Sequence, residues 1–420
     1  MRHISKPGWA LFVLTAISTC GFIDRIVMNV LVQPIKLEFG LSDTQIGLVA
    51  GLAFALLNVV LGLWLSRVAE RRRRLTLIGI GTFLWSVATA ACGAATSFAT
   101  LALARVGVGV GEAFGLPSTQ SVVSDYFPKE KRTTAISVLL LAPPIGAFLG
   151  SAGGGMIAQA WGWRTAFVIA SIPGFVLALL VLLTVAEPSR GQHDDLGNDG
   201  ETIPPFTAVL KRMWLRHSLR HMLAGSAIAS MAGFGVNAFL AAFLARRFGY
   251  SVGEAAVAAG VLTSAPATLG VLGAGWISDR MARKDARAYG TIPGWSLVLA
   301  APIYIFAVTR ETAGAAIGLL ALAALFQYCY LGPSQGIFQN QMHPRMRASS
   351  TAVTTMVYSL VGGGLGPVLV GKLSDHFAMA NGDAGGLTTA LAVTALLYLW
   401  AAVHFLWGTR RIREELALPL

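Results

Sequence analysis

The sequence predicts an all-helical membrane protein whose twelve transmembrane helices form two six-helix bundles. The 420 residues are 55% apolar and only 12% charged, and the mean hydropathy is +0.65, which is too apolar for an ordinary soluble protein. About 20 consecutive apolar residues are needed to cross a bilayer, so runs of that length indicate spans. The two halves of the chain also share motifs at a nearly constant offset, which indicates a duplication.

Twelve apolar runs meet the length criterion, and their even number places both ends of the chain on the same side of the membrane. In chain order they are Trp9–Val32, Ile46–Leu65, Leu75–Ala95, Ala99–Val123, Thr133–Gln159, Trp163–Val185, Leu219–Leu244, Ala255–Ile277, Gly290–Val308, Ala313–Phe338, Thr351–Leu373 and Leu387–Trp407.

The basic residues report the orientation of these spans. If the N-terminus is cytoplasmic, 24 of the 32 Lys and Arg residues lie on cytoplasmic segments, 6 lie on outer segments, and Arg25 and Arg105 lie within the membrane. This is the positive-inside pattern. We therefore expect a multi-pass inner (plasma) membrane protein with both termini cytoplasmic, and we attribute the net charge of +12 to topology, not to a nucleic-acid partner. The first span is too long for a signal-peptide core, so we expect it to remain uncleaved.

Two loop motifs occur once in each half of the chain. Ser66–Arg74 and Gly275–Arg283 share the pattern small, any, aliphatic, small, acid, Arg, any, any, Arg at an offset of 209. The proline-containing loops that begin at Phe127 and His343 match at an offset of 216. Such duplication is typical of transporters. It predicts a first bundle at residues 1–185, a cytoplasmic linker at 186–218, and a second bundle with a short tail at 219–420.

We predict little structure or function for the linker and the C-terminal tail. The end of the linker, Phe206–His217, has the composition of a basic amphipathic helix at a membrane surface, although a plain solvated connector is the simpler interpretation. The tail after Gly408 is short, and we assign it no role beyond topology.

Four full charges lie in the interior of predicted spans, where a charge usually faces a partner or a cavity. Helical rise places Asp24, Arg25 and Arg105 at one depth and Glu112 about 10 Å closer to the cytoplasm, as a separate layer without an adjacent cation. Asp24 and Glu112 are candidates for proton coupling, and the alternative is a permanently ionised partner of an Arg. Arg25 and Arg105 suit a carboxylate or phosphate of the substrate, and at least one is expected to pair with Asp24.

The second half does not duplicate these ionisable positions, so we expect coupling to reside in the first six helices. Its polar and aromatic residues are candidates for the substrate lining, and a helix-packing hydrogen bond is an equally good interpretation of each. These candidates are Asn237, Gln327, Tyr328, Tyr330, Ser334 and Tyr358. On the cytoplasmic loops, Glu70, Arg71, Asp279 and Arg280 are expected to form gate pairs that break between conformations.

The sequence contains no arrangement that indicates an enzyme. The run Gly107-Val-Gly-Val-Gly111 superficially matches a nucleotide-binding loop, but no strand precedes it, and small residues at this spacing in an apolar helix favour close helix packing. The three cysteines fall within predicted spans, and neither a metal-ligand spacing nor a nucleophile–base pair is present. We expect no cofactor and no metal.

The motifs resemble those of the major facilitator superfamily. They are the acid-Arg-x-x-Arg loop of both halves, Arg105-x-x-x-Gly109, and the glycine-rich fifth span from Pro143 to Gly155. Ser66 and Glu70 depart from this pattern, because the family more often has Gly and Asp there.

Within that superfamily, three segments resemble the bacterial Spinster-like lipid transporters: Asp24-Arg25, Gly109–Ala113 and Gln33–Gly47. The first two also occur in anion:cation symporters of sugar acids. The resemblance implies a proton-coupled or facilitated carrier of amphipathic anions or lysolipids, and we expect it to be a monomer. It would work by alternating access around a cavity lined by helices 1, 4, 7 and 10. A symporter of small organic anions is the alternative within this class, and a membrane sensor that binds without transport is the alternative outside it. Efflux of diverse cations fits two cavity arginines poorly.

Overall fold

The computed structural model is entirely helical over the residues it describes, which are 6–114, 116–189, 206–342 and 346–417. Its first-half elements are α1 (Pro7–Val30), α2 (Val32–Phe39), α3 (Asp43–Gly47), the π-helix η1 (Leu48–Leu52), α4 (Ala53–Arg71), α5 (Arg74–Gly93), α6 (Phe98–Glu112), α7 (Leu116–Tyr126), α8 (Lys129–Leu139) and α9 (Ala142–Thr184). Its second-half elements are α10 (Phe206–Leu215), α11 (His217–Phe248), α12 (Val252–Ala282), α13 (Ala288–Val308), α14 (Ala313–Gln327), η2 (Tyr328–Tyr330), α15 (Leu331–Asn340), α16 (Arg347–Val357), the π-helix η4 (Tyr358–Leu365), α17 (Gly366–Gly408), η5 (Thr409–Arg411) and α18 (Ile412–Ala417).

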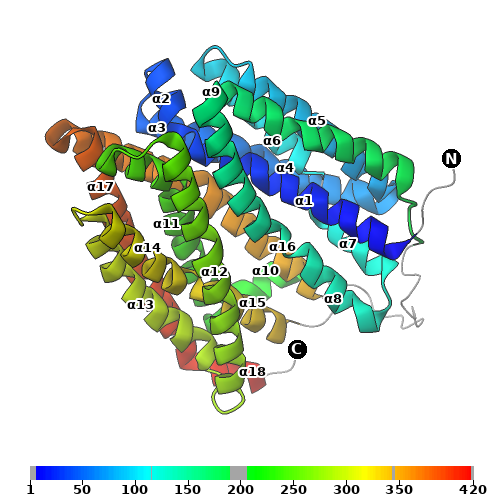
Figure 1. The fold of residues 1–420 in the computed structure, drawn as a ribbon. Coiled ribbons are helices and arrows are strands. Elements are labelled where there is room, and N and C mark those ends of the chain that lie inside the picture. Colours follow the sequence, from blue (N-terminus) through cyan, green and yellow to red (C-terminus); the bar gives the residue numbers. More distant parts are fainter. Residues whose placement is uncertain (1–5, 115, 190–205, 343–345, 418–420) are drawn as a thin grey trace. The chain divides into compact units, whose positions relative to one another are not determined.

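These elements form two compact units. The first unit comprises Met1–Gly200 together with Tyr250–Gly260, and the second comprises Glu201–Gly249 and Val261–Leu420. In the first unit α9 packs on α1 and α5, and α5 packs on α6 (Figure 1). In the second unit α17 packs on α11 and α13, and α13 packs on α14. The same set of neighbours therefore recurs in both units, as the shared loop motifs predict.

A glycine kink divides each of the two longest helices. The kinks lie at Gly162 (φ 83°, ψ 159°) in α9 and at Gly382 (φ 69°, ψ 173°) in α17, a backbone conformation that is essentially restricted to glycine. Nine helical stretches of the described chain are long and apolar enough to cross a membrane, and the two kinked ones, of 51 and 68 residues, are each too long for one crossing. When each of these two stretches is divided at its kink, the nine stretches become eleven spans. The helices α6 and α7 together form the twelfth span.

The fourth span of each unit is broken at the same repeat position. The helices α6 and α14 both contain 15 residues and begin 215 residues apart, and each is followed by a short interruption and a second helix. Pro117 and Pro333 lie in the first turn of those second helices, and a proline provides no N–H for the carbonyl four residues earlier. The predicted span Ala99–Val123 is therefore two helices, and Glu112 is the last residue of the first one.

The C-terminal tail contributes more than topology, which corrects our expectation. Glu415 is buried, and its carboxylate accepts the backbone N–H groups of His217 and Ser218 at 2.5 and 2.9 Å. These N–H groups belong to the first turn of α11, where they have no partner within the helix. Arg413 pairs with Asp285 at 2.7 Å and holds the pKa of that carboxyl below its usual range. The tail is thus attached to α11 and to the α12–α13 loop.

The end of the predicted linker forms a helix, whereas a plain solvated connector was our simpler interpretation. Helix α10 covers Phe206–Leu215, with Val209 and Met213 buried, and Arg212 donates to the carbonyl of Gln341 at 3.0 Å. The segment 190–205 of the linker lies outside the described residues.

Candidate substrate and coupling site

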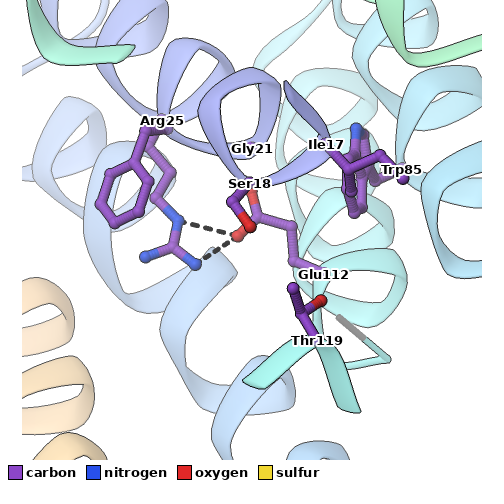
Figure 2. A pocket seen from close by; sticks show the side chains of 8 residues that line it. Ile17, Ser18, Gly21, Arg25, Trp85, Glu112 and Thr119 are labelled. Atoms are coloured by element: carbon purple, nitrogen blue, oxygen red, sulfur yellow. Dashed lines mark hydrogen bonds and ion pairs between the residues drawn. The ribbon is translucent and has the colours of Figure 1, made fainter. Parts of the chain in front are cut away.

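The centre of the first unit contains an ion pair between α1 and the end of α6. The Arg25 guanidinium donates to Glu112 Oε2 through Nε at 2.7 Å and also through Nη2 (Figure 2). The Glu112 side chain is 4% exposed, whereas that of Arg25 is 26% exposed. An ion pair with one accessible partner leaves the guanidinium able to meet an incoming anion.

Our expectation that Glu112 has no adjacent cation is therefore wrong, because Arg25 pairs with it. The Glu112 carboxyl lies beside Gly21, one turn before Arg25, where a Cβ on residue 21 would be 3.9 Å away, an ordinary contact distance. The long arginine side chain spans the remaining distance. The expectation considered only the spacing of the helix backbones and ignored this reach.

Asp24 faces a different neighbour from Arg25, because consecutive residues of a helix point about 100° apart. It is 2% exposed, and its Oδ2 accepts a hydrogen bond from the Thr89 hydroxyl of α5 at 3.0 Å. Its Oδ1 is buried without a hydrogen-bond partner. No arginine of the described chain forms an ion pair with Asp24, so the expected Asp24–Arg pair is absent there. A half-satisfied buried carboxyl is suited to carry a proton.

The two arginines meet at an aromatic ring. The guanidinium carbons of Arg25 and Arg105 lie 4.8 and 5.4 Å from the centroid of Phe54, which follows the π-helix η1 in the second span. Such π-helical turns are frequent at functional sites. Arg105 is 1% exposed, and its Nε has no hydrogen-bond partner. Arg25 and Arg105 thus both lie against the Phe54 ring.

A small cavity of about 30 Å³ adjoins the ion pair (Figure 2). Its lining includes Ser18, Arg25 and Glu112, and the second carboxylate oxygen of Glu112, Oε1, is buried without a partner. This volume is enough for about one water molecule, which needs polar neighbours of this kind. The wall consists of Ile17, Ser18, Gly21, Phe22, Arg25, Trp85, Glu112 and Thr119.

Close helix packing around the site depends on glycine, as the sequence predicts. A Cβ at Gly109 would lie 2.4 Å from the carbonyl oxygen of Phe54, and one at Gly111 would lie 2.5 Å from the backbone nitrogen of Trp85. Gly109 therefore faces α4 and Gly111 faces α5. The GxGxG run is a packing surface within a helix.

At the matching break in the second unit, neutral hydrogen bonds replace the ion pair. Asn237 of α11 donates to the Tyr328 hydroxyl at 2.7 Å. Gln327 is 2% exposed and accepts from the Tyr398 hydroxyl at 2.7 Å. Tyr398 was not among our candidates, and its position in an apolar span gave no signal. The bonds of Gln327 join α14 to α17 and support the packing interpretation of this residue.

The remaining second-unit candidates are mostly internal. Tyr330 is 5% exposed, and its ring meets that of Tyr358 edge to face, with centroids 6.4 Å apart. Ser334 donates to the Tyr330 carbonyl at 2.6 Å. Of the phenylalanines on α11, Phe239 is fully buried, whereas Phe234 is 49% exposed and offers apolar surface.

The expected gate residues separate into described and undescribed ones. The Asp279 carboxylate accepts from the Tyr289 hydroxyl at 3.0 Å, and Arg280 lies over Trp276 at 5.6 Å. The side chains of Glu70 and Arg71 lie outside the described residues. The gating role of all four remains a prediction.

Sequence reasoning overlooked a charged cluster at the end of the first loop motif. Arg74 is 2% exposed and pairs with Asp125 and with Glu187, the latter at 2.9 Å. It also donates to the Ser121 hydroxyl at 2.9 Å. The three charged residues come from α5, α7 and the segment after α9, so no spacing in the sequence brings them together. Arg74 fastens the ends of these elements to one another.

Comparison with known proteins identifies the relatives of the chain. It is 33% identical to an "MFS-type efflux pump" of Mycolicibacterium smegmatis, over 98% of this chain and 95% of the relative. It is 24% identical to the "probable sphingolipid transporter spinster homolog 3" of Arabidopsis thaliana, over 96% and 84%, and 26% identical to the hexuronate transporter of Bacillus subtilis (strain 168), over 90% and 91%.

A solved structure shows the same fold. The crystal structure of a bacterial homolog to the human lysosomal transporter Spinster has a TM-score of 0.92 and 29% identity, and the match covers 99% of both chains. The family model described as Major Facilitator Superfamily matches residues 13–367. This chain therefore belongs to the major facilitator superfamily and is a membrane transporter, not an enzyme.

Proposed function

We propose that this transporter is a secondary active carrier that moves an amphipathic anion or lysolipid by alternating access and couples that movement to protons. The observation that carries the proposal is the Arg25–Glu112 pair, with its partly exposed guanidinium and its buried carboxylate. An anionic headgroup that binds Arg25 competes with Glu112 for the same donors. The displaced carboxylate would then be buried without a counter-ion, which favours its protonation.

Asp24 provides a second protonatable group near this pair. Its electrostatic neighbours include Glu112, Arg105 and Arg25, so a change of charge on any of them alters the energy of the others. In the second unit Asn237, Tyr328 and Tyr358 supply neutral polar and aromatic surface, and the buried Gln327 and Tyr330 support it by packing. Glu70, Arg71, Asp279 and Arg280 act as gate residues. We place both termini in the cytoplasm and take the monomer as the working unit.

The relatives support two substrate classes. The Spinster-type relatives support a lipid with an anionic headgroup, and the hexuronate transporter supports a small organic anion. Arginine can bind the anionic group of either substrate class, so the two classes differ in whether the substrate carries an apolar tail. Each buried methylene contributes about 0.8 kcal/mol, which is about fourfold in affinity. Affinity for a lipid carrier should therefore rise steeply along a homologous series of anionic amphiphiles.

The test measures uptake by proteoliposomes under a pH gradient, with a lysolipid series and a sugar acid compared. We expect affinity to rise with chain length and Arg25→Ala to weaken every member, whereas Arg25→Lys, which keeps the charge but not the fork, should weaken them less. Affinity independent of chain length, with strong competition by the sugar acid, would establish the small-anion symporter instead. Binding of the series without any uptake would support the sensor.

A further inference from the structure

The C-terminal end of α17 carries a surface unrelated to the central site. Its apolar residues Val393, Leu396, Trp400, Val403 and Trp407 are between 36% and 54% exposed, and their spacing of three and four residues places them on one helix face. This face is about 21 Å long at 1.5 Å per residue, enough to cross one leaflet of a hydrocarbon core roughly 30 Å thick.

A basic cluster lies where this face ends. Arg410 continues the face by one turn, and its guanidinium lies 5.5 Å from the Trp407 ring centroid. Arg220 of α11, Arg410 and Arg411 all lie within electrostatic reach of His217. Among the described residues none of these three arginines forms an ion pair with a carboxylate. The nearby acid Glu415 is engaged by the first turn of α11.

The cluster and the apolar face meet in a built groove. It encloses about 410 Å³ and is lined by Val403, Leu406, Trp407 and Arg410. The Trp407 ring is held from α11 by stacking on His221, with centroids 5.2 Å apart and planes inclined by 18°. His221 is in turn hydrogen-bonded to His404, Nδ1 to Nδ1 at 3.0 Å. Trp407 is therefore fixed in position and presents Arg410 at the edge of the groove.

We propose that this groove binds an anionic phospholipid of the leaflet on the side of the C-terminus. The phosphate of the lipid contacts Arg410 and Arg411, and an acyl chain lies along Val403 and Trp400. The charge distribution of the chain predicts that this leaflet is the cytoplasmic one, where anionic lipids attract basic residues near the surface. A second copy of the chain fits this surface poorly, because a two-fold contact would bring the two arginine clusters together.

The test compares lipids bound to the full-length purified protein. After delipidation the protein is incubated with phosphatidylglycerol or phosphatidylcholine of the same acyl chains, and bound lipid is counted by native mass spectrometry. We expect a preference for phosphatidylglycerol. Because a basic residue near an anionic lipid surface contributes about fivefold in affinity, Arg410→Gln and Arg411→Gln should each reduce that preference about fivefold.

Arg310→Gln is the matched control, because Arg310 also lies over an aromatic ring, that of Phe306 at 3.5 Å, but outside the cluster. It should leave the preference unchanged, and an equal loss in this variant would overturn the proposal. Displacement of the lipid by millimolar inorganic phosphate would show a site for free anions and would also overturn it. Formation of a dimer instead of lipid binding would likewise overturn the proposal. An unfolding midpoint equal to that of the wild type in each variant shows that the substitution has not destabilised the fold.

Discussion

At the scale of single residues, the proposed mechanism requires the substrate to open the Arg25–Glu112 ion pair. If Glu112 carries the coupled proton, Glu112→Gln fixes the neutral state, because an amide imitates a protonated carboxyl. Accumulation driven by a pH gradient should then be abolished, and exchange of substrate at equal concentrations should persist. Both are measured in proteoliposomes. Accumulation at the wild-type level in both Glu112→Gln and Asp24→Asn would mean that other residues handle the coupling ion.

Asp24 permits a separate test of stability. Its only hydrogen bond among the described residues comes from Thr89, so Thr89→Val should leave a buried carboxyl unsatisfied at a cost of about 1–3 kcal/mol. Asp24→Asn removes the charge and keeps the shape, and a buried amide costs less than a buried carboxylate. We expect a lower thermal unfolding midpoint in detergent for Thr89→Val and no loss for Asp24→Asn. The opposite order would show that the Asp24 charge itself stabilises α1 against α5.

At the scale of elements, the position of α1 depends on the glycines of α9. A Cβ at Gly146 would lie 2.5 Å from the Phe22 Cβ and 2.8 Å from the Thr19 carbonyl oxygen, whereas one at Gly153 would meet nothing within 4 Å. Overpacking costs about 1–3 kcal/mol, and alanine in an open helical position is up to about 1 kcal/mol better than glycine. Gly146→Ala should therefore lower the unfolding midpoint, and Gly153→Ala should keep or raise it.

The same pair of variants tests transport. Gly146→Ala displaces the helix that carries Asp24 and Arg25, so substrate affinity should fall together with stability. Gly153→Ala serves as the control on the same helix. Equal effects of both variants would show that α9 tolerates side chains on either face and that its glycines have no part in positioning α1.

The elements also show what the sequence alone can predict. The length of the apolar runs predicted the spans, because few backbone structures other than helices can cross a bilayer. Charges within those runs indicated Asp24, Arg25, Arg105 and Glu112, because a charge inside a membrane costs free energy and is therefore rare. The pairing was not predictable, because it depends on the reach of an arginine side chain and on a ring from another helix. The helix break after Glu112 could have been predicted from Gly115 and Pro117, because glycine and proline disfavour a continuous helix. The Arg74 cluster joins three segments that are distant in the sequence, so no local sequence pattern predicts it.

At the scale of the whole molecule, the duplicated unit has diverged chemically while its geometry is retained. Each unit breaks its fourth span at the same repeat position, and one break holds the Arg25–Glu112 ion pair while the other holds Gln327 and Tyr328. Discontinuous helices near the midplane are common in transporters.

The orientation of the molecule can be tested by cysteine labelling. Arg72 and Arg247 are both exposed, and the three native cysteines are buried, which keeps background labelling low. The charge distribution places position 72 in the cytoplasm and position 247 outside. A membrane-impermeant maleimide added to intact cells should therefore modify Arg247→Cys and spare Arg72→Cys. Modification of position 72 but not of position 247 would overturn the topology.

The attachment of Glu415 to α11 has a practical consequence for handling the protein. A truncation after Gly408 would remove the carboxylate that accepts the first amides of α11 and would leave the seventh span to fray from its start. Variants shortened at this end should therefore yield less folded protein, although the segment removed lies outside the predicted spans. An affinity tag joined after Leu420 leaves Glu415 in the chain and should not reduce the yield of folded protein.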